Sequence, residues 1–355
     1  MPNSIKIGNN VIGNCSPCFI IAEAGVNHNG DMEVAHKLID AAAEANADAV
    51  KFQTFKTENL ILDDIEKASY QKETTNAGES QTEMLKRLEI DKAFHVELFK
   101  YCEEKNILFL STCYDEDSLN LLVELGVPAI KIASTDTTNL LFLEKVAKTK
   151  KPVILSTGMC SLSEIEQAYQ CLKENGCKEL ALLKCTSNYP TDPKDVNLNA
   201  MVTMNNSFEA VIGFSDHTEG VGASPYAVAM GASIIEKHFT LDKRLEGPDH
   251  QASLSPDELL LWVKEIRKVE QMLGSSEILS TESEKEAKKA LQKHLVSKID
   301  LKKGDTVTRK SIAAKRTGGK GISALEFYNV LGATLTCDLS QDRPIEESHL
   351  EKRVK

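Results

Sequence analysis

Short apolar runs alternate with amphipathic segments between about residues 19 and 274. Each run is typical of a buried strand, and the segments between them carry apolar residues at three- and four-residue spacing, as helices do. The runs are CFIIAEAG, DAVKFQTF, ILFLSTCYD, PAIKIAS, PVILSTG, LALLKCTS, AVIGFSDH and ASIIEKHFT. Eight such units predict an α/β fold, a closed (β/α)8 TIM barrel. An open doubly wound sheet shares the alternation, but no GxGxxG follows the first strand, which favours closure.

Three segments lie outside this regular alternation. Residues 5–13 are typical of a hairpin. Residues 56–91 form a connection too long for an ordinary loop, and we expect it to lie over the barrel mouth with a functional role. After Gly274 the chain becomes polar and highly charged, and short β-type runs with glycine turns follow. We therefore expect a barrel domain over residues 1–275, a linker over 276–290 and a small β-rich domain over 291–355.

Composition narrows the class of protein. The 355 residues carry a formal net charge of −11 and contain no apolar run long enough to span a bilayer. The acidic balance argues against a nucleic-acid partner. The N-terminus lacks the layout of a signal peptide, and nine cysteines in such a chain indicate reduced thiols. We expect a cytoplasmic protein with no membrane partner, in which Cys15 and Cys18 are ordinary thiols rather than a redox or zinc pair.

Lysines interrupt three of the apolar runs. Because side chains alternate along a strand, we expect Lys51, Lys131 and Lys184 to point into the barrel near its mouth. Each lysine would otherwise snorkel or pair with a carboxylate such as Glu23. Several cations at one mouth predict a phosphate or carboxylate ligand. Hydroxyl groups at the same strand ends would help to hold it: Thr112, Ser134, Ser156, Thr157, Ser187 and Ser215.

Two neighbouring strands each end with a histidine. His217 shares a face with Ser215, and His238 shares a face with Glu236. If both faces point inward, two imidazoles converge, with Glu236 just below them in a position to support metal ligands. Two histidines with oxygen ligands suit a divalent transition ion such as manganese, cobalt or zinc. The alternative is a pair of hydrogen-bonded core histidines.

Six motifs in order resemble the sialic acid synthase family: IIAEAGVNHNGD, AVKFQTFK, LSTGM, GFSDHT, EKHFTLDK and GPDHQASLSPDE. The tail resembles that family's antifreeze-like (SAF, β-clip) domain. The resemblance implies an enzyme that condenses phosphoenolpyruvate (PEP) with N-acetylmannosamine, giving N-acetylneuraminate and phosphate. A related 2-acetamido or 2,4-diacetamido sugar would give a legionaminic- or pseudaminic-type acid instead. The resemblance also implies a divalent metal, with manganese expected first and magnesium or cobalt as alternatives.

The resemblance assigns roles to residues at the matching positions. Glu23, Asp136 and Lys51 would act in catalysis, and His217 and His238 would bind the metal. PEP would be held by Lys51, Thr112, Lys131, Ser134, Ser156, Ser215 and one or both of Ser187 and Asn188. The sugar would contact Asn76, Tyr189, Asp249 and Arg316.

The family likeness also implies a domain-swapped homodimer, in which Arg316 reaches the sugar in the partner's barrel; the alternative is a solvated arginine. Two stretches depart from the family pattern. Ser134-Thr135-Asp136 stands where many members read Ser-Gly-Glu, and RTGGKG stands where they often read Arg-Pro-Gly-Thr-Gly. Two other functions stay open at this point. One is an octulosonate- or heptulosonate-type synthase that acts on a sugar phosphate, and the other is a scaffold that binds glycan or ice.

Overall fold

The computed structural model describes residues 4–13, 15–62, 65–67, 75 and 78–351. The chain divides into two compact units, Met1–Gly274 and Ser275–Lys355. The nine cysteines all lie in the described ranges and are free, which includes Cys15 and Cys18. In the same ranges, none of the helices combines the length and the apolar character needed to cross a membrane.

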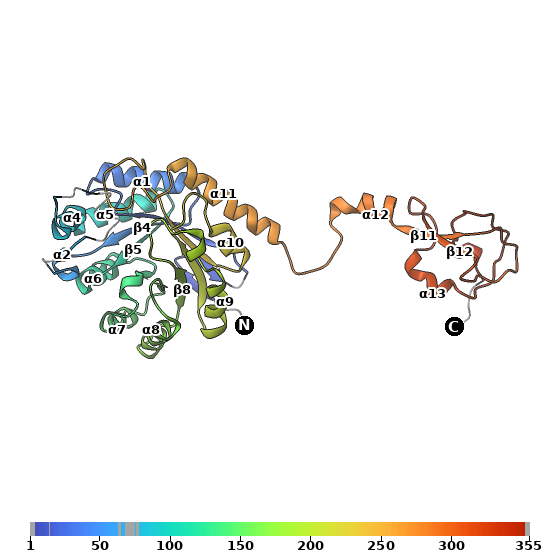
Figure 1. The fold of residues 1–355 in the computed structure, drawn as a ribbon, viewed down its shortest axis with the longest axis horizontal. Coiled ribbons are helices and arrows are strands. Elements are labelled where there is room, and N and C mark those ends of the chain that lie inside the picture. Colours follow the sequence, from blue (N-terminus) through green and yellow to red (C-terminus); the bar gives the residue numbers. More distant parts are fainter. Residues whose placement is uncertain (1–3, 14, 63–64, 68–74, 76–77, 352–355) are drawn as a thin grey trace. The chain divides into compact units, whose positions relative to one another are not determined.

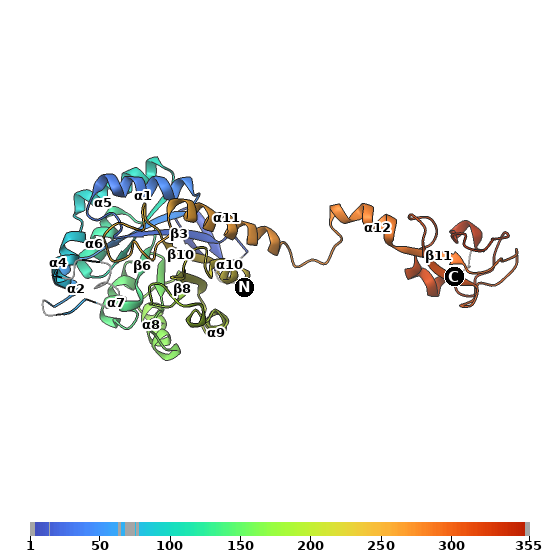
Figure 2. The same ribbon diagram turned by 45° about the horizontal axis from the view of Figure 1, so that its top comes forward.

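Eight parallel strands of the first unit close into a barrel in the order β10-β3-β4-β5-β6-β7-β8-β9 (Figures 1 and 2). The predicted (β/α)8 fold is therefore confirmed, and each predicted apolar run contains one strand. The strands are β3 (Phe19–Gly25), β4 (Ala49–Thr54), β5 (Leu108–Cys113), β6 (Ile130–Ile132), β7 (Val153–Ser156), β8 (Leu180–Cys185), β9 (Val211–Asp216) and β10 (Ile234–His238).

Helices pack around the outside of the barrel (Figure 1). Several begin where a side chain accepts a backbone hydrogen bond in the first turn, as Asp31, Asp91 and Asp115 do. The helices are α1 (Met32–Glu44), α2 (Thr57–Leu60), α4 (Gln81–Leu88), α5 (Lys92–Glu104), α6 (Glu116–Leu125), α7 (Leu140–Lys148), α8 (Leu162–Glu174), α9 (Asn199–Ser207), α10 (Ser224–Ala229) and α11 (Pro256–Leu273). Two short 3-10 turns, η1 (Ser134–Asp136) and η2 (Pro193–Asp195), follow β6 and β8.

The barrel interior is apolar toward the amino ends of its strands. Inward side chains there form one buried cluster that includes Phe19, Leu110 and Ile154. The predicted hairpin is confirmed as β1 (Ser4–Ile7) paired with β2 (Asn10–Gly13), and its isoleucines join the same cluster. The hairpin thus closes this end of the barrel, and chemistry is left to the opposite end, where active sites of such barrels lie.

The long connection over residues 56–91 contains two of the helices, α2 and α4. Part of it packs into a small apolar cluster, in which Met84 and Leu88 of α4 meet Val26 and Phe55. Val26 and Phe55 directly follow β3 and β4, so the cluster attaches the connection to the carboxyl ends of these strands. The part of the connection that packs into this cluster accordingly lies at the barrel mouth, as expected.

The second unit has its own small core, with Leu295, Val307 and Ile345 among its buried members. Its regular strands, β11 (Lys293–Ser297) and β12 (Ile312–Arg316), pair antiparallel, and isolated bridges connect further segments. Its other elements are η3 (Glu282–Glu284), α12 (Lys285–Leu291), η4 (Ala324–Glu326), α13 (Phe327–Val330) and η5 (Glu347–His349). A small antiparallel sheet in this region is consistent with the predicted β-rich tail.

Candidate active site

A cavity of about 600 Å³ opens at the carboxyl ends of the barrel strands. Inward positions of the strands supply its polar floor. Most of the predicted site residues line it: Glu23, Lys51, Thr112, Lys131, Ser134, Ser156, Ser187, Tyr189, Ser215, His217, Glu236, His238 and Asp249. Residues that are far apart in the sequence therefore meet because the barrel brings their strand ends together.

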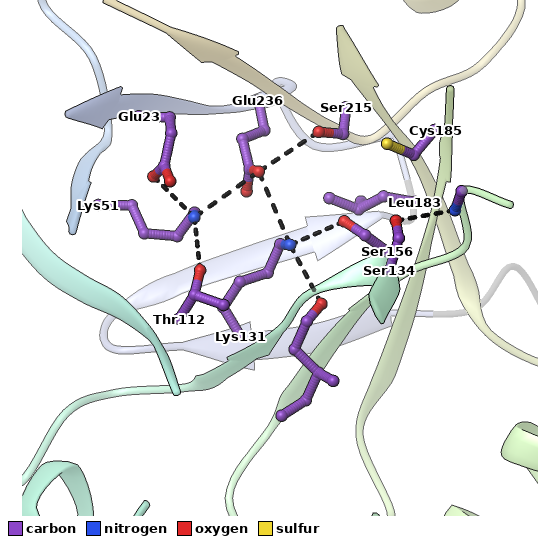
Figure 3. Close-up of polar contacts among 12 residues, drawn as sticks. Glu23, Lys51, Thr112, Lys131, Ser134, Ser156, Leu183, Cys185, Ser215 and Glu236 are labelled. Atoms are coloured by element: carbon purple, nitrogen blue, oxygen red, sulfur yellow. Dashed lines mark hydrogen bonds and ion pairs between the residues drawn. The ribbon is translucent and has the colours of Figure 1, made fainter. Parts of the chain in front are cut away.

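Lys51 belongs to a buried polar cluster on this floor (Figure 3). Its Nζ lies 2.7 Å from Oε2 of Glu23 and donates a hydrogen bond of 2.7 Å to the hydroxyl of Thr112. Glu236 approaches the same ammonium group at 3.7 Å. Glu23 and Lys51 are direct neighbours in the β3–β4 ladder, so strand register alone sets this ion pair.

Lys131 occupies a matching position on β6. Its Nζ donates hydrogen bonds to the Ser156 hydroxyl at 2.7 Å and to the Ile132 carbonyl at 3.2 Å. Glu236 Oε1 lies 3.7 Å from this ammonium group too, so one carboxylate bridges both lysines. The other oxygen, Oε2, has no hydrogen-bond partner among the described residues. Glu236 was expected to support the metal ligands from below the histidines. Its carboxylate also compensates the charges of two buried lysines.

Burial shifts the pKa of each of these groups in one direction, and the attraction between opposite charges shifts it in the other. Burial raises the pKa of Glu23 to about 7, although Lys51 partly counteracts the shift. Burial also lowers the pKa of Lys131, which Glu236 partly offsets. For Glu236 burial would raise the pKa, but Lys131 and Lys51 together hold it below its ordinary value. An ionised Glu236 therefore offsets part of the effect of burial on Lys131, and Glu23 is poised to exchange a proton near neutral pH.

The hydroxyl groups of Ser134 and Ser187 meet beside Gly158 at one corner of the cavity. Ser134 accepts a hydrogen bond of 2.8 Å from the backbone N–H of Gly158. A Cβ atom at Gly158 would clash with the hydroxyl oxygens of both Ser134 and Ser187, so only glycine lets these groups share the corner. Of the two residues that the sequence left open, Ser187 lines this cavity and Asn188 lines a neighbouring one.

His217 and His238 meet at the mouth with their ring centroids 5.6 Å apart. Nδ1 of His217 bonds to the Thr186 carbonyl at 2.7 Å. Because a carbonyl only accepts, this nitrogen carries a proton, and Nε2 is the one available to a ligand. Tyr189 packs against the same ring at a centroid distance of 4.1 Å.

The two histidines have different electrostatic surroundings. Burial lowers the pKa of His238 well below its ordinary value, and its Nδ1 has no hydrogen-bond partner among the described residues. Burial would also lower the pKa of His217, but Cys185 and the Thr186 carbonyl outweigh it and raise the value. Among the described residues no group of three or more histidine, cysteine or acidic side chains forms a metal cluster. This pair could supply two nitrogen ligands, so that water or substrate oxygens would complete the coordination.

Three predicted residues are not placed in the lining of the cavity. Asp136 does not line the cavity, and its carboxylate accepts hydrogen bonds from Asn139 and Thr135 beside its own turn. Arg316 lies on β12 in the second unit with an exposed side chain. Asn76 falls outside the described residues. Thr135, the residue before Asp136, faces the cavity instead.

The expectation that Lys184 points inward is wrong. Leu183 belongs to the inner cluster and Leu182 to the outer one, so Lys184 continues the outward series of β8. Its Nζ donates to the Cys185 carbonyl and to the Thr186 hydroxyl, and the side chain lines the neighbouring cavity. Two leucines before a lysine left the face undetermined, and only the barrel register decides it.

One side of the cavity was predicted only as a segment, because the sequence placed residues 56–91 over the mouth without identifying the apolar side chains there. This apolar wall consists of Val26, Phe55, Leu60, Ile61, Ile65, Met84, Leu85, Leu88 and Tyr114. The sequence carried one signal for it, since Val26, Phe55 and Tyr114 each directly follow the end of a strand. Gln53 was also missed, although it alternates with Lys51 on β4 and donates a hydrogen bond to Glu23 at 3.3 Å.

Fold and site together define a (β/α)8 barrel with two buried lysines on the floor of its cavity and a histidine pair at the mouth. Residues 38–278 match the model of the NeuB family. The N,N'-diacetyllegionaminic acid synthase of Campylobacter jejuni is 46% identical over 93% of this chain and 99% of its own. The human N-acetylneuraminate-9-phosphate synthase is 36% identical over 97% and 96%.

A solved structure gives the same result. The crystal structure of N-acetylneuraminic acid (sialic acid) synthetase from Leptospira borgpetersenii, in complex with citrate, is 40% identical and has a TM-score of 0.73. The match covers 81% of this chain and 95% of that one. The chain belongs to the NeuB family, that of the sialic acid synthases, and it is an enzyme.

The substitution Glu236→Gln tests the buried charge cluster. It removes the carboxylate that bridges Lys51 and Lys131, and breaking a buried ion pair costs about 3–5 kcal/mol. We expect the free energy of unfolding of the barrel to fall by about 3 kcal/mol. Trp262 is the single tryptophan and is fully buried in α11, so its fluorescence in urea reports this transition.

The matched control is Glu209→Gln, which removes an exposed carboxylate from the same unit. It should change the free energy of unfolding by less than about 0.5 kcal/mol. Equal stability of the two variants would contradict the idea that Glu236 compensates the lysines.

Proposed function

We propose that the protein condenses PEP with an unphosphorylated 2,4-diacetamido sugar, giving a legionaminic-type nine-carbon acid and inorganic phosphate. The observation that carries this proposal is the pair of buried lysines, Lys51 and Lys131, which converge on one cavity with hydroxyl donors around them. PEP presents a phosphate and a carboxylate, and paired ammonium groups with hydroxyls suit both. The barrel thus offers a site for the anion that every member of this reaction class must hold.

The choice of acceptor is supported by similarity and by charge. The Campylobacter relative, at 46% identity, is named as a diacetyllegionaminic acid synthase. In the part of the chain that the structure describes, Lys51 and Lys131 are the only lysine or arginine side chains that line the cavity. A phosphate on the acceptor would require a further cation. N-acetylmannosamine is the second candidate, favoured by the name of the Leptospira structure.

The chemistry follows from the parts on the floor. Lys51 and Lys131 hold the PEP phosphate while the PEP methylene carbon bonds to the aldehyde carbon of the open-chain sugar. The aldehyde oxygen takes a proton, and a positive charge develops on the adjacent PEP carbon. Water adds to that carbon, and the tetrahedral intermediate loses inorganic phosphate to leave a keto acid. The Glu23 carboxylate, close to Lys51, would stabilise the positive charge and accept a proton from the water.

His217 and His238 would hold the divalent metal, manganese in our proposal. The residues fit such an ion, because the carbonyl partner of His217 engages its Nδ1 and leaves Nε2 available, and Nδ1 of His238 is buried with no hydrogen-bond partner among the described residues. A neutral imidazole is a common ligand for such ions. When bound, the metal supplies a Lewis acid for the aldehyde oxygen.

The direct test of the proposed function is phosphate release from PEP in the presence of manganese and a panel of sugars. We expect turnover with a 2,4-diacetamido-trideoxy mannose-type sugar, at a kcat/KM higher than with N-acetylmannosamine. An acceptor phosphorylated at carbon 6 should be the poorest of the panel. Turnover of the phosphorylated sugar alone would contradict the proposed acceptor, and no phosphate release with any sugar would contradict the function.

The anion site can be tested without turnover. PEP should raise the melting temperature of the barrel, since a ligand that binds only the native state stabilises it. Lys131→Met should remove most of this shift. Lys184→Met is a matched control, because that lysine is also half-buried at a strand end but points out of the barrel. An unchanged shift in Lys131→Met, or an equal loss in both variants, would count against the placement of PEP.

Metal binding is tested by titrating manganese into the protein and measuring heat or electron paramagnetic resonance. His217→Ala and His238→Ala each remove one of two nitrogen ligands, so manganese affinity should fall at least about 100-fold. His36→Ala, which removes a partly exposed histidine of α1, should leave the affinity unchanged. Undiminished affinity in both active-site variants would exclude the histidine pair as the metal site.

A further inference from the structure

The apolar wall leaves two large side chains uncovered. Leu60 is 36% exposed and Ile65 is 50% exposed, and both line the cavity. Behind them, Phe55, Met84 and Leu88 are almost fully buried and hold the wall in place. Single exposed apolar residues are ordinary on a protein surface. Apolar side chains that gather on one side of a concave polar site instead indicate an apolar group on the ligand.

Gln81 adds a polar group to this wall. It begins α4 and lines the same cavity, and its Oε1 is buried with no hydrogen-bond partner in the described part of the chain. Buried polar atoms are nearly always paired, so an unpaired one that faces a ligand site indicates a missing partner. A side-chain amide beside exposed leucine and isoleucine matches an acetamido group, which presents an N–H, a carbonyl and a methyl together.

The position of the wall indicates which part of the acceptor it meets. Three of its residues directly follow β3, β4 and β5, whereas His217 and His238 lie at the ends of β9 and β10. In the ring of eight strands β3 is the neighbour of β10 and β5 stands opposite β9, so the wall extends from the side of His238 toward the side that faces His217. A sugar with its aldehyde carbon beside the histidines and PEP therefore has its first two carbons at the floor. Its far end, carbons 4 to 6, extends toward α2 and α4.

We infer that Gln81 and the apolar wall form the subsite for the 4-acetamido group and the carbon-6 methyl group of the acceptor. Gln81 would pair with the amide, and Leu60 and Ile65 would cover the methyl groups. N-acetylmannosamine carries hydroxyl groups at both positions, which this surface serves poorly. The subsite would thus select the diacetamido sugar, an inference that rests on the proposed function.

Two pairs of variants test the inference. Gln81→Met keeps the length of the side chain and removes the amide, and Gln170→Met is its control on the exposed face of α8. Leu60→Asn makes the wall polar, and Leu62→Asn is its control, since Leu62 is 77% exposed and does not line the cavity. The cavity variants alter side chains outside the packed core, so the barrel should stay folded, which Trp262 fluorescence in urea verifies.

The measured quantity is the ratio of kcat/KM for the 2,4-diacetamido-trideoxy sugar to that for N-acetylmannosamine. We expect this ratio to fall about tenfold in Gln81→Met and in Leu60→Asn, because each loses an interaction made only with the diacetamido sugar. Both controls should keep the ratio of the unmodified protein.

An unchanged ratio in both cavity variants would overturn the subsite, whatever the absolute rates. Equal losses with the two sugars would overturn it as well, because the surface would then bind the 2-acetamido group that they share. Either result leaves the synthase function intact, since the unmodified protein still turns over both sugars. If the unmodified protein releases no phosphate with either sugar, the proposed function itself fails and the subsite fails with it.

Discussion

Two lysines buried at the mouth of the barrel impose the main constraint on this structure. Taking an ammonium group out of water costs several kcal/mol unless an opposite charge is close. Glu23 and Glu236 supply that charge, and Glu236 serves both lysines at 3.7 Å. Glu236 is ionised and Glu23 is ionised for part of the time near neutral pH, so the carboxylates offset much of the lysine charge before any ligand arrives. An anionic substrate can therefore bind only if it displaces the carboxylates from the lysines or brings a cation with it.

The barrel tolerates these buried charges because the apolar clusters that stabilise it lie apart from the polar residues of the site. Toward the amino ends of the strands an apolar cluster fills the interior, and the hairpin of β1 and β2 closes it. Outside, a much larger apolar cluster packs the strands against the helices. Polar side chains collect only in the last inward positions, where neighbouring strands hold them in register, as in the pairs of Glu23 with Lys51 and His238 with Glu23. The register of the strands thus fixes the positions of these charges.

The sequence predicts those features of the site that depend on neighbouring residues of one strand, and it does not predict those that depend on distant parts of the chain. Alternation within one strand is local, and it correctly places Lys51, Lys131 and the histidines on inward faces. The face of Lys184 depends on the barrel register, and a run of leucines does not reveal it. The carboxylate of Asp136 accepts a hydrogen bond from Asn139 within a turn that the motif does not specify. The apolar wall could not be predicted from pattern, because the packing of α4 against the strand ends creates it.

The central claim is that Lys51 and Lys131 hold the phosphate of PEP on the floor of the barrel. A crystal structure of the protein with PEP and manganese tests this most directly. The account predicts phosphate oxygens within about 3.2 Å of both ammonium groups, with Glu236 moved away from at least one of them. PEP bound elsewhere, or a phosphate that touches neither lysine while Glu236 still bridges them, would contradict the account.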